Sequence, residues 1–129
     1  MKKIDYIATI GFYLCNVILF IFYLFPGSII GYLLYTDLGK QPNFVHTPVG
    51  TSINHFFYFF YLTFLGLVYN LNRKKFINSF LFILILSFSL ELLHFVIPNR
   101  AFELNDLLAN IAGVTGIFFL FKLKKNFSS

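Results

Sequence analysis

A glutamate and a histidine stand one helical turn apart near the end of a long apolar stretch. Glu91 and His94 are spaced i, i+3, and Ser87 lies four residues before Glu91, so the three side chains share one stripe of a predicted helix. A carboxyl group beside an imidazole can give or take a proton during a reaction, as general acid or base. We therefore take Glu91 and His94 as candidate catalytic residues.

A second polar stripe follows in the next predicted helix, where Asp106 and Asn110 are spaced i, i+4. Arg100 lies in the turn before them. Because a guanidinium fork binds carboxylates and phosphates, Arg100 is expected either to pair with Glu91 or a phosphate group or to be solvated. His55 opens another apolar stretch. His55, Arg100, Asp106 and Asn110 are the candidate ligand-binding residues.

Each of these residues also has a purely structural interpretation. A carboxylate in the first turn of a helix is stabilised by about 0.3–1 kcal/mol by the helix dipole, so capping alone can explain Asp106. Asn110 can serve interhelical hydrogen bonding, and His55 can be an ordinary boundary residue. Glu91 can tie helices together, but an acidic side chain at the centre of a membrane helix costs roughly 2.5–3.5 kcal/mol. This cost predicts a partner, a proton or water beside Glu91.

The composition identifies the surroundings of these polar groups. Hydrophobic residues make up 58% and aromatic residues 22% of the 129 residues, while only 12% are charged, about half the share of an ordinary soluble domain. A globule of this size cannot bury twenty Phe and eight Tyr side chains, so lipid must cover many of them. Disorder and a nucleic-acid-binding module are excluded on similar grounds. The single cysteine, Cys15, excludes an intramolecular disulfide.

Apolar stretches predict four transmembrane helices, over residues 5–25, 53–70, 76–97 and 106–121. The outer connection spans residues 26–52 and starts with a Pro-Gly pair that ends the first helix. Within it, residues 28–38 are expected to lie along the membrane interface or to re-enter the membrane, and 41–51 to form a loop with a solvated His46. The prediction is one all-α domain, an integral membrane four-helix bundle with an interfacial or re-entrant segment after the first span.

Basic residues predict the orientation of this bundle. Eight of the ten Lys and Arg residues lie at one set of helix ends and two lie at the other. By the positive-inside rule, both termini and the turn at 72–75 face the cytoplasm, and the long connection and the third turn face outward. The net charge of +5 is then explained by topology. The eight are Lys2, Lys3, Arg73, Lys74, Lys75, Lys122, Lys124 and Lys125, against Lys40 and Arg100.

The order of the polar landmarks resembles the VanZ-like family of membrane proteins. That family carries E-x-x-Q, then a proline and an arginine, then D-x-x-x-N-x-x-G on the last span, and an earlier span with a lysine three residues before a histidine. His94 stands at the glutamine position and Ser52 at the lysine position. The likeness covers nearly the whole chain and is most specific in the last third. The landmarks are Leu24, Pro26, His55, Glu91, His94, Pro98, Arg100, Asp106, Asn110, Gly113 and Gly116.

The resemblance implies a cell-envelope protein of the plasma membrane, since the family is named for resistance to the glycopeptide antibiotic teicoplanin. Our first hypothesis is an outward-facing polar pocket that binds or processes an amphiphilic, phosphate-bearing lipid or lipid-linked cell-wall precursor, without nucleic acid as a partner. The alternative is a non-catalytic membrane factor in which the same residues clamp the helices together. A metal site built from Glu91, His94, His55 and Asp106 lacks the second Glu-x-x-His pair of helix-bundle metal sites, so no metal or other cofactor is predicted.

Overall fold

The computed structural model describes residues 3–42, 48–71 and 76–127, which form five helices joined by turns and contain no strand. The helices are α1 (Lys3–Leu24), α2 (Ile29–Tyr35), α3 (Ser52–Leu71), α4 (Phe76–Leu93) and α5 (Leu104–Phe127). The predicted all-α class is confirmed. The predicted solvation of His46 and the predicted cationic turn at 72–75 lie outside the described residues.

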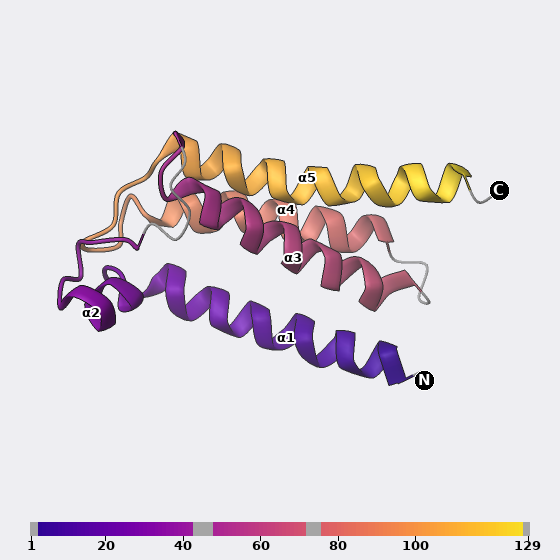
Figure 1. Cartoon of the computed structure of the whole chain (residues 1–129), viewed down its shortest axis with the longest axis horizontal. Helices are drawn as coiled ribbons and strands as arrows, with labels where there is room; N and C mark the ends of the chain where they lie inside the picture. The colour runs from indigo at the N-terminus through magenta and orange to yellow at the C-terminus, as the bar shows by residue number, and fades with distance from the viewer. Residues whose placement is uncertain (1–2, 43–47, 72–75, 128–129) are drawn as a thin grey trace.

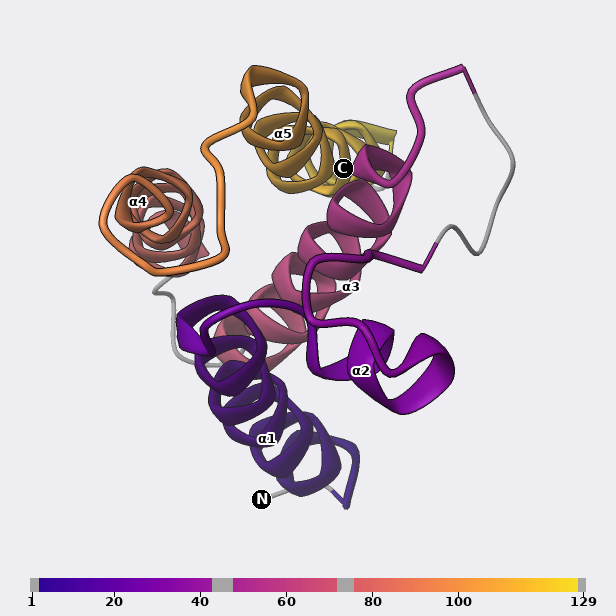
Figure 2. The same cartoon turned by 90° about the vertical axis from the view of Figure 1, so that its left-hand side faces the viewer.

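The four long helices run along one another in a bundle (Figure 1). Helix α3 is central: it packs most extensively against α5 and also contacts α1 and α4. The view along the bundle shows α3 between α1 and α5 (Figure 2). The start of α1 and the end of α5 lie at one end, which we call the terminal end (Figure 1). Helix α2 and the connection between α4 and α5 lie at the other end, which we call the α2 end.

Three helices are long and apolar enough to cross a membrane, over Tyr6–Leu24, Ser52–Tyr69 and Leu104–Lys124. Their outward side chains are largely apolar; on α1, for example, Ile7, Leu14 and Ile21 are each exposed by more than half. Helix α4 is equally apolar, but its apolar part, Asn78–Leu93, is shorter. By length and composition, these helices are those of a membrane protein.

Helices α3 and α5 approach most closely at Gly113. A Cβ atom at this position would lie 2.5 Å from the Phe56 carbonyl oxygen and 2.9 Å from the Phe60 nitrogen. Only glycine therefore allows the two backbones to come this near, as small residues do between membrane helices. Gly116, three residues further along α5, has nothing within 4 Å of its Cβ position, so it takes no part in this contact.

Helix α4 ends at Leu93, four residues before the predicted end of its span at residue 97. The amides of His94, Phe95 and Val96 instead donate to carbonyls three residues earlier, in tight turns. Pro98 keeps the helix from resuming after this turn, because it has no N–H to continue the helix and its ring would clash with the carbonyl of His94. The predicted span 76–97 is thus a shorter helix followed by a turn.

Helix α5 is longer than its predicted span of 106–121 at both ends, since it runs from Leu104 to Phe127. Its first turn forms when the Asp106 and Leu107 amides donate to the Glu103 carbonyl. Its last turns contain several lysines, which are good helix formers and interact favourably with the carbonyl end of a helix. These lysines therefore lie within α5 and not beyond its end.

Helix α2 is a seven-residue helix within the predicted 28–38 segment. The Ser28 hydroxyl caps it by accepting the Gly31 amide at 2.9 Å, and it ends at Thr36, whose backbone is left-handed with φ 54°. The Ser28 amide then donates to the Leu38 carbonyl at 2.6 Å. A Cβ at Gly31 would lie 1.7 Å from the Lys40 carbonyl oxygen, so glycine permits this fold-back of the chain.

Candidate functional site

Seven polar side chains meet inside the bundle at the α2 end, and we call them the polar cluster. They come from α1, α3, α4, the turn after α4, and α5, so every long helix contributes. All are buried except His55, whose side chain is 12% exposed. The cluster consists of Tyr23, Ser52, His55, Glu91, His94, Asp106 and Asn110.

A chain of polar contacts joins α1, α3 and α5 within the cluster. The Ser52 hydroxyl donates to Asp106 Oδ1 at 2.5 Å, and Asp106 Oδ2 lies 3.4 Å from His55 Nε2. His55 Nδ1 is 2.6 Å from the Tyr23 hydroxyl, which donates to Asn110 Oδ1 at 3.2 Å. Tyr23 has a single hydroxyl proton for these two contacts, so when it donates to Asn110, the proton of the bond to His55 is on Nδ1.

Glu91 is fully buried on α4, and its two carboxylate oxygens have different surroundings. Oε1 accepts the backbone amide of Glu103 at 3.3 Å and lies 3.2 Å from His94 Nδ1. Oε2 has no hydrogen-bond partner among the described residues, and the same is true of His94 Nε2 and Asn110 Nδ2. The cluster thus contains buried donors and acceptors that are available to a ligand.

Three residues of the cluster have the chemistry and spacing of metal ligands. His55, Glu91 and Asp106 each offer one ligand atom, and these atoms lie within 4.8 Å of one another. They come from α3, α4 and α5, so the packing of three helices determines their separation.

Arg100 lies beside the cluster, and its described hydrogen bonds go to the backbone of α1. Its Nη2 donates to the Phe22 carbonyl and its Nε to the Phe25 carbonyl, the latter at 3.3 Å. The guanidinium therefore binds carbonyls at the end of α1, where a cation is favourable. Burial lowers the pKa of Arg100, while neighbouring acidic groups, including Tyr23 and Glu91, act in the opposite direction. The expected direct pairing of Arg100 with Glu91 is not among the described ion pairs.

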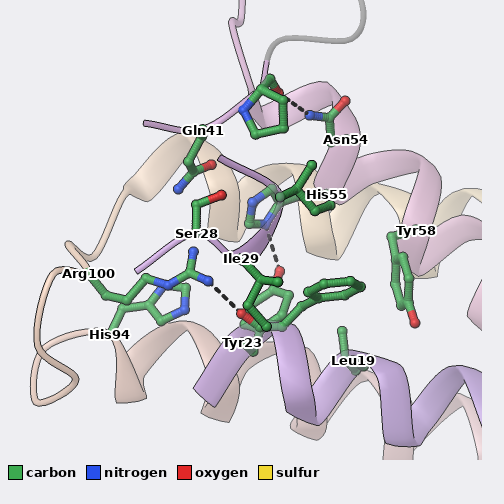
Figure 3. A pocket seen from close by; sticks show the side chains of 13 residues that line it. Leu19, Tyr23, Ser28, Ile29, Gln41, Asn54, His55, Tyr58, His94 and Arg100 are labelled. Atoms are coloured by element: carbon green, nitrogen blue, oxygen red, sulfur yellow. Dashed lines mark hydrogen bonds between the residues drawn. The ribbon is translucent and has the colours of Figure 1, made fainter. Parts of the chain in front are cut away.

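A pocket of about 150 Å³ adjoins the cluster, between α1, α3 and the fold-back after α2 (Figure 3). Its polar lining includes residues of the cluster together with Arg100 and Asn54, and its apolar lining comes mainly from α1 and α2. The cluster and the pocket therefore share side chains, and a molecule in the pocket can contact both. The lining residues are Leu19, Phe22, Tyr23, Ser28, Ile29, Ile30, Gln41, Pro42, Asn54, His55, Tyr58, His94 and Arg100.

The structure brings together five of the six residues selected from the sequence, and it places the sixth, Arg100, in the lining of the adjoining pocket. Ser87 shares the sequence stripe with Glu91, but its hydroxyl donates to the Leu84 carbonyl at 2.8 Å. The five residues are His55, Glu91, His94, Asp106 and Asn110.

Two residues of the cluster were not selected as site residues from the sequence. Ser52 stands at the lysine position of the family pattern, and its hydroxyl donates to Asp106. Tyr23 is one of eight tyrosines, and no spacing distinguishes it from those that face outward. Its only signal is its position three residues before Pro26, which puts it at the same end of the bundle as the other polar residues.

Comparisons with known proteins found no matching protein-family model, no matching curated protein and no matching solved structure.

Proposed function

We propose that the chain is a VanZ-like protein of the cell envelope that crosses the plasma membrane four times, with both termini in the cytoplasm and the α2 end outward. Three helices of membrane-spanning length support this, together with the order of polar residues from Glu91 onward. Helix α4 has 18 residues, and at 1.5 Å per residue it is about 27 Å long, close to a hydrocarbon core of about 30 Å. The exposed lysines Lys122 and Lys124 at the terminal end fit a cytoplasmic side.

The proposed ligand is an amphiphilic lipid or lipid-linked cell-wall precursor that carries a phosphate group. The observation that supports it best is the pocket, which Arg100 and His55 line together with the apolar Leu19 and Ile29. A pocket this small suits a head group, and the exposed apolar helices nearby suit acyl or prenyl chains.

Each residue has a defined role in this proposal. Arg100 and His55 bind the anion, and Asn110 holds His55 in position through the Tyr23 hydroxyl. If the ligand is processed as well as bound, the buried Glu91 and His94 pair is the group that exchanges protons with it.

A binding experiment tests whether the protein recognises the phosphate group of the ligand. The full chain in detergent is titrated with a polyprenyl monophosphate and with the corresponding uncharged polyprenol. We expect the phosphate to bind at least tenfold more tightly, which corresponds to about 1.4 kcal/mol. Arg100→Gln should remove most of this preference, whereas Lys40→Gln, which removes an exposed cation of the same end, should keep it. Equal affinities for phosphate and alcohol in the unaltered chain would disprove the proposal.

The second candidate function is that of a non-catalytic membrane factor whose polar cluster is an interhelical clamp. It is favoured by contacts that cross from helix to helix, such as Tyr23 to Asn110 and Ser52 to Asp106, and by the bonds from Arg100 to α1. A clamp predicts that Glu91→Gln lowers stability and activity together. A binding site predicts that the variant keeps its thermal stability in detergent and loses only ligand binding or the envelope phenotype.

A further inference from the structure

Two buried carboxylates face each other inside the polar cluster. Glu91 is 0% and Asp106 2% exposed, and with His55 they offer ligand atoms that lie within 4.8 Å of one another. Two like charges at this distance repel strongly in a medium of low dielectric constant. The described hydrogen bonds of Arg100 go to the backbone carbonyls of Phe22 and Phe25. A positive charge between the carboxylates, either a proton or a cation, would therefore offset their repulsion.

In each carboxylate, one oxygen accepts a hydrogen bond from a neighbouring residue, and the other oxygen is available to a ligand. Oε1 of Glu91 accepts the Glu103 amide, while Oε2 is buried and has no described partner. Oδ1 of Asp106 accepts the Ser52 hydroxyl, while Oδ2 lies on the side of His55. Metal-binding carboxylates commonly show this pattern, because a second shell of donors fixes the oxygen that does not bind the ion.

His55 follows the same pattern. In the tautomer that donates from Nδ1 to the Tyr23 hydroxyl, the neutral ring presents a lone pair at Nε2. That Nε2 lies 3.4 Å from Asp106 Oδ2, which is longer than a good N–H···O bond of about 2.7–3.2 Å. An imidazole whose other nitrogen donates to a fixed partner is the usual form of a histidine metal ligand. A cation between His55 Nε2 and Asp106 Oδ2 accepts a lone pair from each of these atoms.

We propose that His55 Nε2, Glu91 Oε2 and Asp106 Oδ2 bind a divalent transition-metal ion. The charges of two carboxylates and a divalent ion cancel, so the occupied site carries no net charge into its apolar surroundings. One imidazole and two carboxylates form a ligand set that Zn²⁺ accepts, and three protein ligands leave a coordination position open. Mg²⁺ binds less well, because it prefers oxygen ligands and keeps its waters. This inference stands apart from the proposed lipid ligand: it assigns His55 Nε2 to the ion, which leaves Arg100 as the group of the pocket that binds an anion.

Metal binding is measured on the full chain in detergent, after removal of any affinity tag and treatment with a chelator. The protein is saturated with Zn²⁺, freed of unbound metal by gel filtration and assayed by elemental analysis; calorimetry then gives the affinity. We expect one Zn²⁺ per chain and at least tenfold weaker binding of Mg²⁺. Substoichiometric Zn²⁺ in a chain that keeps its helical circular dichroism would overturn the proposal and leave a proton as the charge between the carboxylates.

Variants separate a specific site from adventitious binding. Glu91→Gln and Asp106→Asn should weaken Zn²⁺ binding by at least tenfold, while Glu103→Gln, a matched change of an exposed side chain, should leave it unchanged. Ser52→Ala keeps all three ligands and should weaken binding by about 10- to 100-fold through Asp106. This variant keeps the test decisive if the ligand variants do not fold. Wild-type affinity in folded Glu91→Gln and Ser52→Ala would contradict the site.

Discussion

At the α2 end, α1, α3 and α5 meet through hydrogen bonds between polar side chains, whereas towards the terminal end the long helices meet mainly through rings and aliphatic groups. Phe12 on α1 stacks on Tyr69 of α3 with ring centroids 5.6 Å apart, and Phe80 on α4 lies 4.2 Å from Phe118 on α5. The polar end joins the same helices through contacts such as Tyr23 to His55 and Ser52 to Asp106.

This difference determines what each half of the bundle tolerates. Ring packing depends on volume, and a lost ring leaves a cavity whose cost grows with its size. A buried hydrogen bond depends on the identity of donor and acceptor, so the loss of one hydroxyl matters even when the volume is kept. The two halves should therefore respond to opposite kinds of substitution.

The largest effect is expected from Phe12→Ala in the ring-packed half. Phe12 is 7% exposed, and loss of a buried Phe ring lowers the free energy of unfolding by about 3–5 kcal/mol. Thermal unfolding in detergent measures this change. Ile10→Ala, at an exposed position of the same helix, should cost far less. If the folded fraction of Phe12→Ala also loses Zn²⁺ binding, the two halves are not independent.

A smaller effect is expected from Tyr23→Phe in the polar half. The ring and its packing stay, but His55 Nδ1 and Asn110 Oδ1 lose their common partner, which costs about 1–3 kcal/mol for buried polar groups. The same unfolding experiment measures it. Tyr61→Phe is the control, because Tyr61 is exposed on α3. Equal stabilities of the two variants would show that the hydroxyl of Tyr23 has no such role.

The smallest effect is a gain in stability from Thr36→Gly at the end of α2. Thr36 has φ 54°, a conformation that β-branched residues rarely adopt and glycine adopts freely. Relief of this strain, less the extra entropy of glycine in the unfolded chain, should stabilise the fold by about 0.5 kcal/mol. Thr36→Ala keeps a Cβ and should show no comparable gain. Equal gains in the two variants would assign the effect to the lost side chain instead.

The sequence predicts contacts within a helix better than contacts between helices. The i, i+3 spacing places Glu91 and His94 side by side, and their side chains lie 3.2 Å apart. The bond from Ser52 to Asp106 joins residues 54 positions apart, and it depends on how each helix is rotated about its own axis. Helices that are apolar on most faces carry little information about that rotation. For this reason the helices were found from the sequence, but the role of Ser52 was not.

The same limit applies to the ends of helices and to Arg100. Pro98 indicates that α4 must stop, but the sequence does not show that the stop comes four residues earlier and turns His94 into the cluster. The carbonyl partners of Arg100 belong to Phe22 and Phe25, at the end of α1 and just after it, 78 and 75 residues away. Every residue has a backbone carbonyl, so the sequence does not indicate which carbonyl a guanidinium binds. It indicates only the carboxylates and the possible phosphate ligand.

The connections of the polar cluster also constrain the order in which the protein can be assembled. Ser52, Glu91 and Tyr23 all have partners that lie at residue 103 or beyond. A chain made from its N-terminus therefore contains these groups before their last partners have been synthesised. Until this last part of the chain is present, Glu91 lacks the Glu103 amide, and Ser52 and Tyr23 lack their partners on α5, so the polar cluster is completed last.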